Sequence, residues 1–527
     1  MAFTFQINPD ISWMYNEKLL KKAQAYTPSL MESRIYPEKL VEIQVDSECN
    51  KDKLVEREEK VHELGELAFG RDEGIVLDLG DHYVGNFSVT IDSVGSPMDA
   101  PLYLRIKFAE VASELFSNSE EYDGWLSKSW IQEEYIHLDT LPTTLELPRR
   151  YAARFIELDV IDSSPKWKAK FTQPLFVAQS SVSLEQAPKI VIDDPLLERI
   201  YTVSVKTLQD CMQTIFEDGP KRDRRLWIGD LRLQALANYA TFEDEELVKR
   251  CLYLFGGMTT EEGKIPANVF TMKQVVPDDT FLFDYSLFFA VILFDYVQYT
   301  QDRVVLTDLY DVAKKEIDLA IKQVDAVGRL NLSEEWPVFV DWSNDFEKST
   351  AGQAIMIYTL KRFIQLADIM GDSDIENYRV IVGKMEEFSR ESLFDESQQQ
   401  FIIEKTGEVN IASQVWMCLA EVMDQKMNRQ ILTKMINEQF PIKNIATPYM
   451  YHHVVEALFE AELDEEAIKL MKEYWGAMVE LGADTFWEAF KPENPEFSPY
   501  GSPIVSSYCH AWSCTPAYLI QKYVLNQ

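Results

Sequence analysis

Acidic side chains predominate in this 527-residue chain, in which 87 Asp and Glu residues stand against 51 Lys and Arg and give a formal net charge of -36. This balance argues against nucleic acid and against an anionic membrane surface as partners, because both bind to basic faces. Hydrophobic residues make up 46% of the chain and aromatic residues 12%, which is enough to bury a large core.

The N-terminal segment, residues 1–18, lacks a basic stretch followed by an apolar one, so we expect no signal peptide. The most apolar run, residues 281–299, is interrupted by Asp284 and Asp295. The stretch between these two acids is too short to cross a bilayer, and a buried helix is the better interpretation of the run. Together these features predict a cytoplasmic protein.

Before about residue 190, apolar and polar residues alternate over short runs, as they do in antiparallel strands buried on one face. This pattern occurs in residues 75–79, 87–91, 102–108 and 167–171. A turn signal, "VGSPMDAP", separates two of these runs. We therefore predict a β-sandwich accessory region over residues 1–190, with residues 34–65 as charged connecting structure.

After residue 190 the apolar period becomes helical. Leu208, Cys211, Met212 and Ile215 fall at the spacing that lines one face of a helix. "DDPLLERI", at residues 193–200, predicts a helix start. Residues 191–527 accommodate about twelve helices of ordinary length and show no sequence repeat. This is compatible with an α/α toroid, although the pattern alone does not exclude two stacked helical bundles.

One short stretch, "EDGPKRDRRLWIGD" at residues 217–230, concentrates charge of both signs. Gly219 and Pro220 break the preceding helix, so the stretch is predicted to be a loop between helices. A surface loop with self-compensating ion pairs is the simple interpretation. Trp227 and its apolar neighbours favour partial burial instead, and a partly buried loop of acids and arginines beside an aromatic ring is suited to a polar ligand.

This stretch resembles the signature of the α-L-rhamnosidases of glycoside hydrolase family 78, in the six-hairpin glycosidase superfamily. "GADTFWEAF" (482–490) and "SSYCHAWSCTPAYLI" (506–520) resemble two further segments of that family, in the same order. The resemblance implies an (α/α)6 barrel after β-sandwich modules. It also implies hydrolysis of terminal α-L-rhamnose, with inversion, from small rhamnosides. The family's short cytoplasmic members suggest a homodimer.

Inversion requires two carboxyl groups about 6.5–9.5 Å apart, one to protonate the leaving oxygen and one to activate water. The resemblance implies that Glu488 is the general base, although an acid at the start of a helix is the structural alternative. Many family members carry their general acid at the position of Arg224. We therefore expect Asp223 to be the acid, with Asp218 and Asp230 as alternatives.

Other residues are expected to bind the sugar. These residues lie in segments that match the family, are carboxylates suited to bind hydroxyls, or belong to an aromatic wall. They are Asp218, Arg222, Trp227, Asp230, Asp341, Trp342, Trp487 and His510. A purely structural role remains open for Asp341, Trp342 and His510. Because Arg222 and Arg224 would lower the pKa of Asp223, we hypothesise that Asp218 and Asp230 bind Arg222 and Arg225 and leave Asp223 in a drier place.

No metal or cofactor is expected, since the six histidines show no metal-ligand spacing and the close pair Cys509 and Cys514 has no second pair of ligands. Six cysteines are also too few for a disulfide framework. Two other functions remain open: a related barrel glycosidase with another sugar specificity, and a carbohydrate-binding protein that has lost its acid, as Arg224 would allow.

Overall fold

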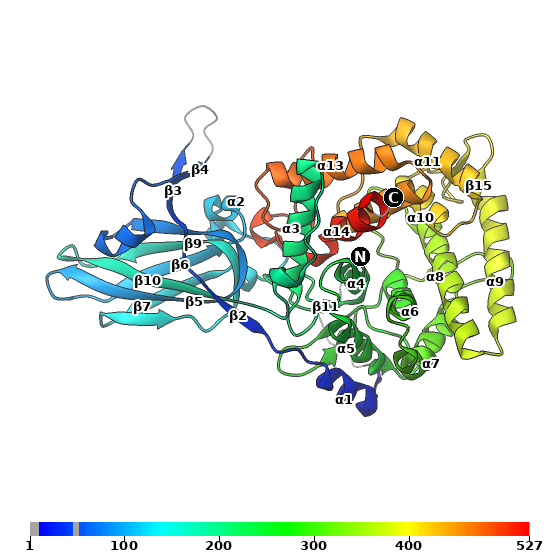
Figure 1. The fold of residues 1–527 in the computed structure, drawn as a ribbon, viewed down its shortest axis with the longest axis horizontal. Helices are drawn as coiled ribbons and strands as arrows, with labels where there is room; N and C mark the ends of the chain where they lie inside the picture. The colour runs from blue at the N-terminus through cyan, green and yellow to red at the C-terminus, as the bar shows by residue number, and fades with distance from the viewer. Residues whose placement is uncertain (1–9, 46–51, 526–527) are drawn as a thin grey trace.

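The computed structural model describes residues 10–45 and 52–525 and divides into a β-rich region and a ring of helices beside it (Figure 1). Residues 1–9, on which the expectation of no signal peptide partly rests, lie outside the described residues. The β-rich region meets the barrel on the side of its first and last helices (Figure 1).

The β-rich region is one antiparallel network with two clusters of buried apolar side chains, a large one and a small one around Val41, Val76 and Phe155. The path β2-β10-β5-β9-β6-β7 is joined by β3 and β8, which pair with β5, and by β4, which pairs with β3. The strands are β2 (Met31–Ile35), β3 (Lys39–Val45), β4 (Asp52–Glu56), β5 (Glu73–Gly95), β6 (Leu102–Ala109), β7 (Glu133–Leu138), β8 (Thr143–Glu146), β9 (Tyr151–Asp162) and β10 (Trp167–Ser180).

The long strand β5 lies between β9 and β10, because its first part pairs with β9 and its last part with β10. The predicted alternation is confirmed: Leu77, Val89, Leu104 and Phe171 are fully buried in one cluster. The interpretation of residues 34–65 as connecting structure was wrong, because β3 and β4 form a hairpin there. Charged residues on its exposed face concealed the alternation.

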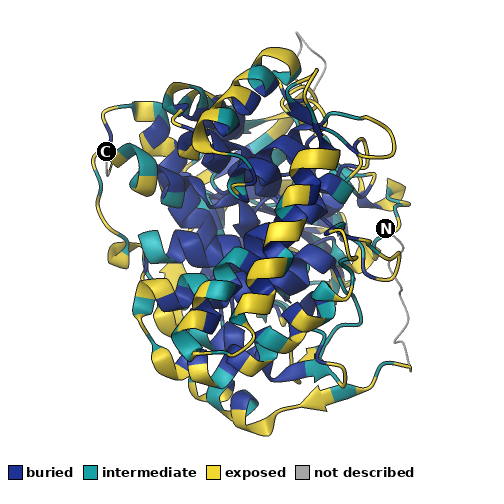
Figure 2. Cartoon of the chain, turned by 90° about the vertical axis from the view of Figure 1, so that its right-hand side faces the viewer, coloured by how far each residue is buried: buried dark blue, intermediate teal, exposed yellow. Residues whose placement is uncertain are grey.

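Twelve helices of the described residues form the (α/α)6 barrel that the family resemblance implied. They are α3 (Pro195–Cys211), α4 (Ile228–Ala240), α5 (Glu245–Gly256), α6 (Phe283–Thr300), α7 (Arg303–Ile321), α8 (Ser349–Met370), α9 (Ile375–Phe388), α10 (Ile411–Leu419), α11 (Gln425–Gln439), α12 (Pro448–Glu460), α13 (Asp464–Glu480) and α14 (Pro516–Leu519). Helices α4, α6, α8, α10 and α12 contact each other in turn, and α14 contacts α4. Buried residues fill the centre of this ring (Figure 2).

The predicted helix start at Pro195 is confirmed, and Asp194 caps it by accepting hydrogen bonds from the amides of Leu196 and Leu197. The apolar run near residues 281–299 is the inner helix α6, whose Phe288 and Leu293 are fully buried. Within the described part of the chain, no helix is long and apolar enough to cross a membrane.

One N-terminal segment belongs to the barrel and not to the β-rich region, which corrects the expected role of residues 1–190. Strand β1 (Trp13–Tyr15) pairs with β12 (Met258–Thr260), and α1 (Glu17–Ala25) packs against α5. Leu19 and Ala23 are buried in the barrel core. These two residues lie four positions apart on one helix face, and that apolar face packs against α5.

Candidate active site

A cavity lies at the N-terminal ends of the inner helices. It brings together eight of the ten predicted site residues from segments far apart in the sequence: Asp218, Arg222, Asp223, Trp227, Asp230, Trp342, Glu488 and His510. The loop before α4 supplies most of the charge, and the segments that follow α13 supply Glu488 and His510. The charged stretch and the two later motifs therefore meet in space.

Asp341 and Trp487 are not among the residues that line this cavity. The carboxylate of Asp341 accepts hydrogen bonds from the amides of Ala446 and Thr447, each at 3.0 Å, which ties its loop to the start of α12. The Trp487 ring packs against Phe490 and Tyr508. Both side chains support the walls of the site from behind.

Five residues of the cavity were not predicted: Leu282, Tyr285, Phe339, Tyr500 and Trp512. Trp512 lies inside the third quoted motif, so its family segment could have indicated it. Tyr285 and Phe339 are buried aromatics that sequence cannot distinguish from ordinary core residues. Tyr500 lies in the loop "SPYGSP", which carries no catalytic pattern.

Arg222 links the two predicted catalytic carboxyls. Its Nη2 donates to Glu488 Oε2 at 2.5 Å and its Nη1 to Asp223 Oδ1 at 3.1 Å, while Nε donates to the carbonyl of Val505. The guanidinium also lies over the Tyr500 ring, 4.2 Å from its centroid. A single buried cation thus stands between Asp223 and Glu488 and keeps them from touching.

The hypothesis that Asp218 and Asp230 bind Arg222 and Arg225 was wrong. Arg222 pairs with Asp223 and Glu488, and Arg225 lies over the Phe270 ring. Arg224 points away from Asp223 and donates to the carbonyl of Pro220 at 2.7 Å. The cationic side chains of this stretch therefore have different partners, and among them only Arg222 lines the cavity.

Asp218 and Asp230 are buried carboxyls that favour the protonated form. Burial, followed by the charge of Asp223, raises the pKa of Asp218 to about 7, although the amides of Asp223 and Arg225 donate to it. Burial, with the charges of Asp218 and Glu488, also raises the pKa of Asp230 well above its ordinary value. Near neutral pH these two carboxyls of the cavity therefore tend to remain protonated.

Asp218→Asn is expected to reduce the pH dependence of stability. The folded protein keeps the Asp218 proton up to about pH 7, whereas the unfolded chain releases it near the ordinary value of about 3.9. This group therefore makes the fold less stable as pH rises from about 4 to about 7. Between about pH 5 and about pH 8, Tm should fall more in the wild type than in Asp218→Asn.

Differential scanning fluorimetry measures this change in Tm at each pH. The exposed residue Asp345 provides the control, since Asp345→Asn should keep the wild-type pH dependence. Identical pH dependence in Asp218→Asn and the wild type would show that the Asp218 carboxyl titrates normally.

Hydrogen bonds orient Glu488, and burial shifts the pKa values of both Glu488 and His510. Glu488 accepts hydrogen bonds from Arg222 and from the Tyr500 hydroxyl, and its backbone carbonyl accepts one from Trp512 Nε1 at 2.9 Å. Burial raises the pKa of Glu488, while the Arg222 charge opposes this change. Burial and the Arg222 charge lower the pKa of His510 well below its ordinary value, so its imidazole is neutral.

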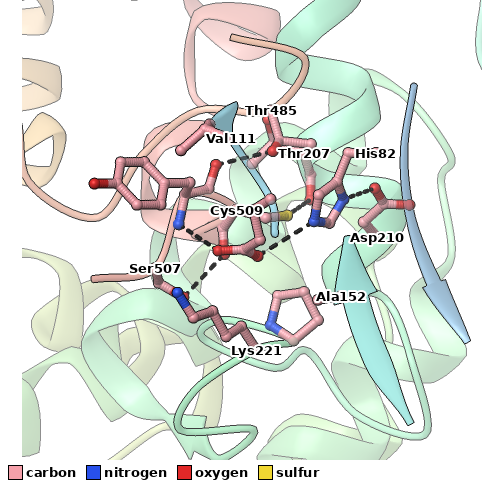
Figure 3. A network of polar contacts seen from close by, with 12 residues as sticks. His82, Val111, Ala152, Thr207, Asp210, Lys221, Thr485, Ser507 and Cys509 are labelled. Carbon is pink, nitrogen blue, oxygen red and sulfur yellow. Dashed lines mark hydrogen bonds and ion pairs between the residues drawn. The ribbon is translucent and has the colours of Figure 1, made fainter. Parts of the chain in front are cut away.

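A buried polar network connects the β-rich region to the segment that carries His510 (Figure 3). His82 Nδ1 lies 2.7 Å from Asp210 Oδ2 on α3, and His82 Nε2 lies 3.2 Å from Glu110 Oε1. The other oxygen of Glu110 accepts the amide of Tyr508 at 2.7 Å. The β-rich region therefore helps to position the barrel loops that form the cavity.

Lys221 makes a second connection of the same kind. Its ammonium pairs with Glu114, on the short helix α2 (Ala112–Phe116), and donates to the carbonyls of Ile504 and Ser506. All four groups are buried or nearly so, and a buried ion pair of this kind fixes geometry more than it adds stability.

His82, Asp210 and Cys509 lie close enough to hold a metal ion, with ligand atoms within 4.8 Å of one another. Neighbouring groups already balance the charges of these side chains, however. Lys206 donates to both oxygens of Asp210 at 2.6 Å. Burial alone would lower the pKa of His82, but the acidic groups around the ring outweigh it and raise this pKa well above its ordinary value. A metal ion at this place would have to displace the proton that the raised pKa favours on His82.

Comparisons with known proteins agree with the fold. Residues 37–178 match the glycosyl hydrolase family 78 α-rhamnosidase N-terminal domain, and residues 185–524 match the bacterial α-L-rhamnosidase 6 hairpin glycosidase domain. A rhamnosidase from Klebsiella oxytoca with rhamnose bound is similar in structure, with a TM-score of 0.94 and 40% identity over 98% of this chain and 100% of that chain. A comparison with curated proteins gives no match.

More distant structures share the fold. The family 78 rhamnosidase of Bacillus sp. GL1 has a TM-score of 0.73 and 19% identity over 89% of this chain and 49% of that chain. The Streptomyces avermitilis α-L-rhamnosidase complexed with L-rhamnose has a TM-score of 0.65 and 15% identity over 94% of this chain and 44% of that chain. From the two domain matches and the similarity to the Klebsiella enzyme, the chain belongs to glycosyl hydrolase family 78, the α-rhamnosidases.

Proposed function

We propose that this α-L-rhamnosidase hydrolyses small rhamnosides with inversion, using Asp223 as general acid and Glu488 as general base. Hydrolysis of terminal α-L-rhamnosides follows from membership of the family and from the rhamnose bound in its Klebsiella relative. The observation that carries the mechanism is the cavity in which Asp223 and Glu488 face each other across Arg222.

The surroundings of Glu488 suit a base that activates water. Arg222 and Tyr500 each donate to one carboxylate oxygen, and such contacts orient the group and favour its ionised form. The buried site excludes bulk water, so that a single water beside Glu488 becomes the nucleophile. Arg222 lies between Asp223 and Glu488, and an inverting mechanism requires its two carboxyls to stand apart, at about 6.5–9.5 Å.

Asp223 is the most accessible of the three acid candidates. Its side chain is 17% exposed, whereas Asp218 and Asp230 are buried residues. A leaving group departs toward solvent, so the acid that protonates it belongs at the outer end of the cavity. Arg222 occupies Oδ1 of Asp223, which leaves Oδ2 to carry the proton.

Asp218 offers a physical route to a protonated acid at neutral pH. The charges of Asp218 and Asp223 interact, and two neighbouring carboxyls resist ionising together. Burial and the Asp223 charge raise the pKa of Asp218 to about 7, so Asp218 adds little negative charge beside Asp223 below that pH. In the proposed mechanism the Asp223 carboxyl gives its proton to the glycosidic oxygen as the aglycone departs.

Asp230 and His510 are suited to bind a sugar hydroxyl between them. Asp230 Oδ1 lies 3.7 Å from His510 Nδ1, and within the described residues neither atom has a hydrogen-bond partner. A hydroxyl placed there would bond to both groups. Trp227, Trp342 and Trp512 add apolar faces that suit the C–H surface of a deoxy sugar.

The remaining parts of the proposal rest on the sequence. The resemblance to the family's short cytoplasmic members supports action in the cytoplasm and a homodimer. Action in the cytoplasm points to small rhamnosides that have already entered the cell. No described feature of the cavity favours a nucleic acid or a membrane surface over a sugar.

Hydrolysis of p-nitrophenyl α-L-rhamnoside, compared with other p-nitrophenyl sugars, tests this function. We expect the rhamnoside to be turned over fastest. Faster turnover of another sugar would support the related glycosidase with different specificity. Binding of rhamnose without turnover of any substrate would support a carbohydrate-binding protein.

A further inference from the structure

A loop of the β-rich region carries an exposed tryptophan to the neighbourhood of the cavity. Residues 117–132 connect α2 to β7, and Trp125 in this segment is 49% exposed. Among the tryptophans that the structure describes, it is the only exposed one. A large apolar ring kept in water beside an active site is typical of a binding surface.

Trp125 continues the aromatic wall of the cavity outward. Its ring centroid lies 5.6 Å from that of Tyr500, with 54° between the ring planes. Tyr500 in turn lies 5.8 Å from Trp342. Tyr500 and Trp342 line the cavity, whereas Trp125 does not, so the three rings extend from the cavity toward solvent.

The loop that carries Trp125 has a defined shape. The hydroxyl of Tyr122 donates to the carbonyl of Leu126 at 3.1 Å, and both residues pack against the apolar cluster that contains Tyr500. A Cβ at Gly124 would lie 2.6 Å from the Tyr122 side chain, so a larger residue there would displace the Tyr122 ring. These contacts hold Trp125 in position before a ligand arrives, which lowers the cost of ordering the loop on binding.

The direction of the leaving group points to the same place, if the proposed function is correct. The glycosidic oxygen must lie at Asp223, the acid at the outer end of the cavity. Arg222 contacts Asp223 and lies over Tyr500, and Trp125 contacts the same Tyr500 ring. An aglycone that leaves from Asp223 toward solvent therefore passes Tyr500 and then Trp125.

We propose that Trp125 forms an aglycone-binding site and stacks on a flat apolar face of the leaving group. Two kinds of aglycone present such a face: an aromatic ring and the C–H face of a second pyranose. The β-rich region thus supplies a residue that determines which rhamnosides the barrel accepts.

Binding measurements in a Glu488→Gln background, where turnover is suppressed, test this proposal. Calorimetry should compare p-nitrophenyl α-L-rhamnoside, a rhamnosyl-glucose disaccharide and free L-rhamnose. We expect Trp125→Ala to weaken binding of at least one of the larger ligands about tenfold, equal to about 1.4 kcal/mol, and to leave the Kd of L-rhamnose unchanged. Trp125→Phe should retain part of the affinity.

Tyr135 provides the matched control, because it is an exposed aromatic on β7 of the same region. Tyr135→Ala should bind all three ligands like the parent. A loss confined to the aryl rhamnoside identifies an aromatic aglycone, and a loss confined to the disaccharide identifies a sugar.

Unchanged affinity of Trp125→Ala for both larger ligands would overturn the proposal, as would an equal loss for all three, which would indicate a structural role. Failure of the proposed function has a separate signature: the wild-type enzyme would hydrolyse no α-L-rhamnoside.

Discussion

Glu488→Gln is expected to lower kcat by about 10²–10⁴-fold or more, the range typical of a lost general base, while preserving the fold. The amide oxygen replaces the carboxylate oxygen that accepts from Arg222, and the amide NH2 group then faces the Tyr500 hydroxyl, which accepts from it. The amide does not take a proton from the attacking water. Initial rates on p-nitrophenyl α-L-rhamnoside measure the loss, and circular dichroism checks the fold.

Glu493 gives a control within the same loop, since its exposed side chain does not line the cavity. Glu493→Gln should keep the wild-type rate. Activity of Glu488→Gln within threefold of the wild type would remove Glu488 from the mechanism.

Asp223→Asn should lose activity in a way that depends on the leaving group. A proton donor matters most when the departing alcohol is a poor leaving group, because the developing alkoxide is strongly basic. p-Nitrophenoxide leaves almost unaided. We therefore expect a much larger loss on a rhamnosyl disaccharide than on p-nitrophenyl α-L-rhamnoside, with a difference that approaches about 10²–10⁴-fold.

Asp218→Asn and Asp230→Asn provide the comparison for this result. If these residues bind the sugar, their loss should slow both substrates about equally, because their contacts do not involve the aglycone. A leaving-group-dependent loss in Asp218→Asn and not in Asp223→Asn would make Asp218 the acid. No such dependence in any of the three would place the proton donor elsewhere on the barrel.

Much of the fold could be predicted because local patterns determine it. Alternation in residues 102–108 corresponds to β6, and the Asp194–Pro195 start corresponds to α3. The hairpin of β3 and β4 was missed because its charged exposed face gives no clear alternation. The packing of α1 on the barrel was missed because a short amphipathic helix does not indicate which surface will cover it.

The site was predictable where a motif carries the residue and not where tertiary contacts decide its role. Eight of the ten predicted residues line one cavity, because the three motifs meet at the same end of the barrel. The pairing of Arg222 with Glu488 joins residues far apart in sequence, and no spacing rule indicates it. Tyr500 was missed for the same reason, since only the folded chain brings its hydroxyl to Glu488.

The anomeric form of the first product tests the central claim, that Asp223 and Glu488 act on opposite faces of the sugar with a water between them. Proton NMR of a reaction with enough enzyme to outrun mutarotation identifies the first rhamnose released. The account predicts β-L-rhamnose, the inverted anomer. Release of α-L-rhamnose would contradict it, because retention requires a covalent intermediate and a closer pair of carboxyls, about 5–5.5 Å apart.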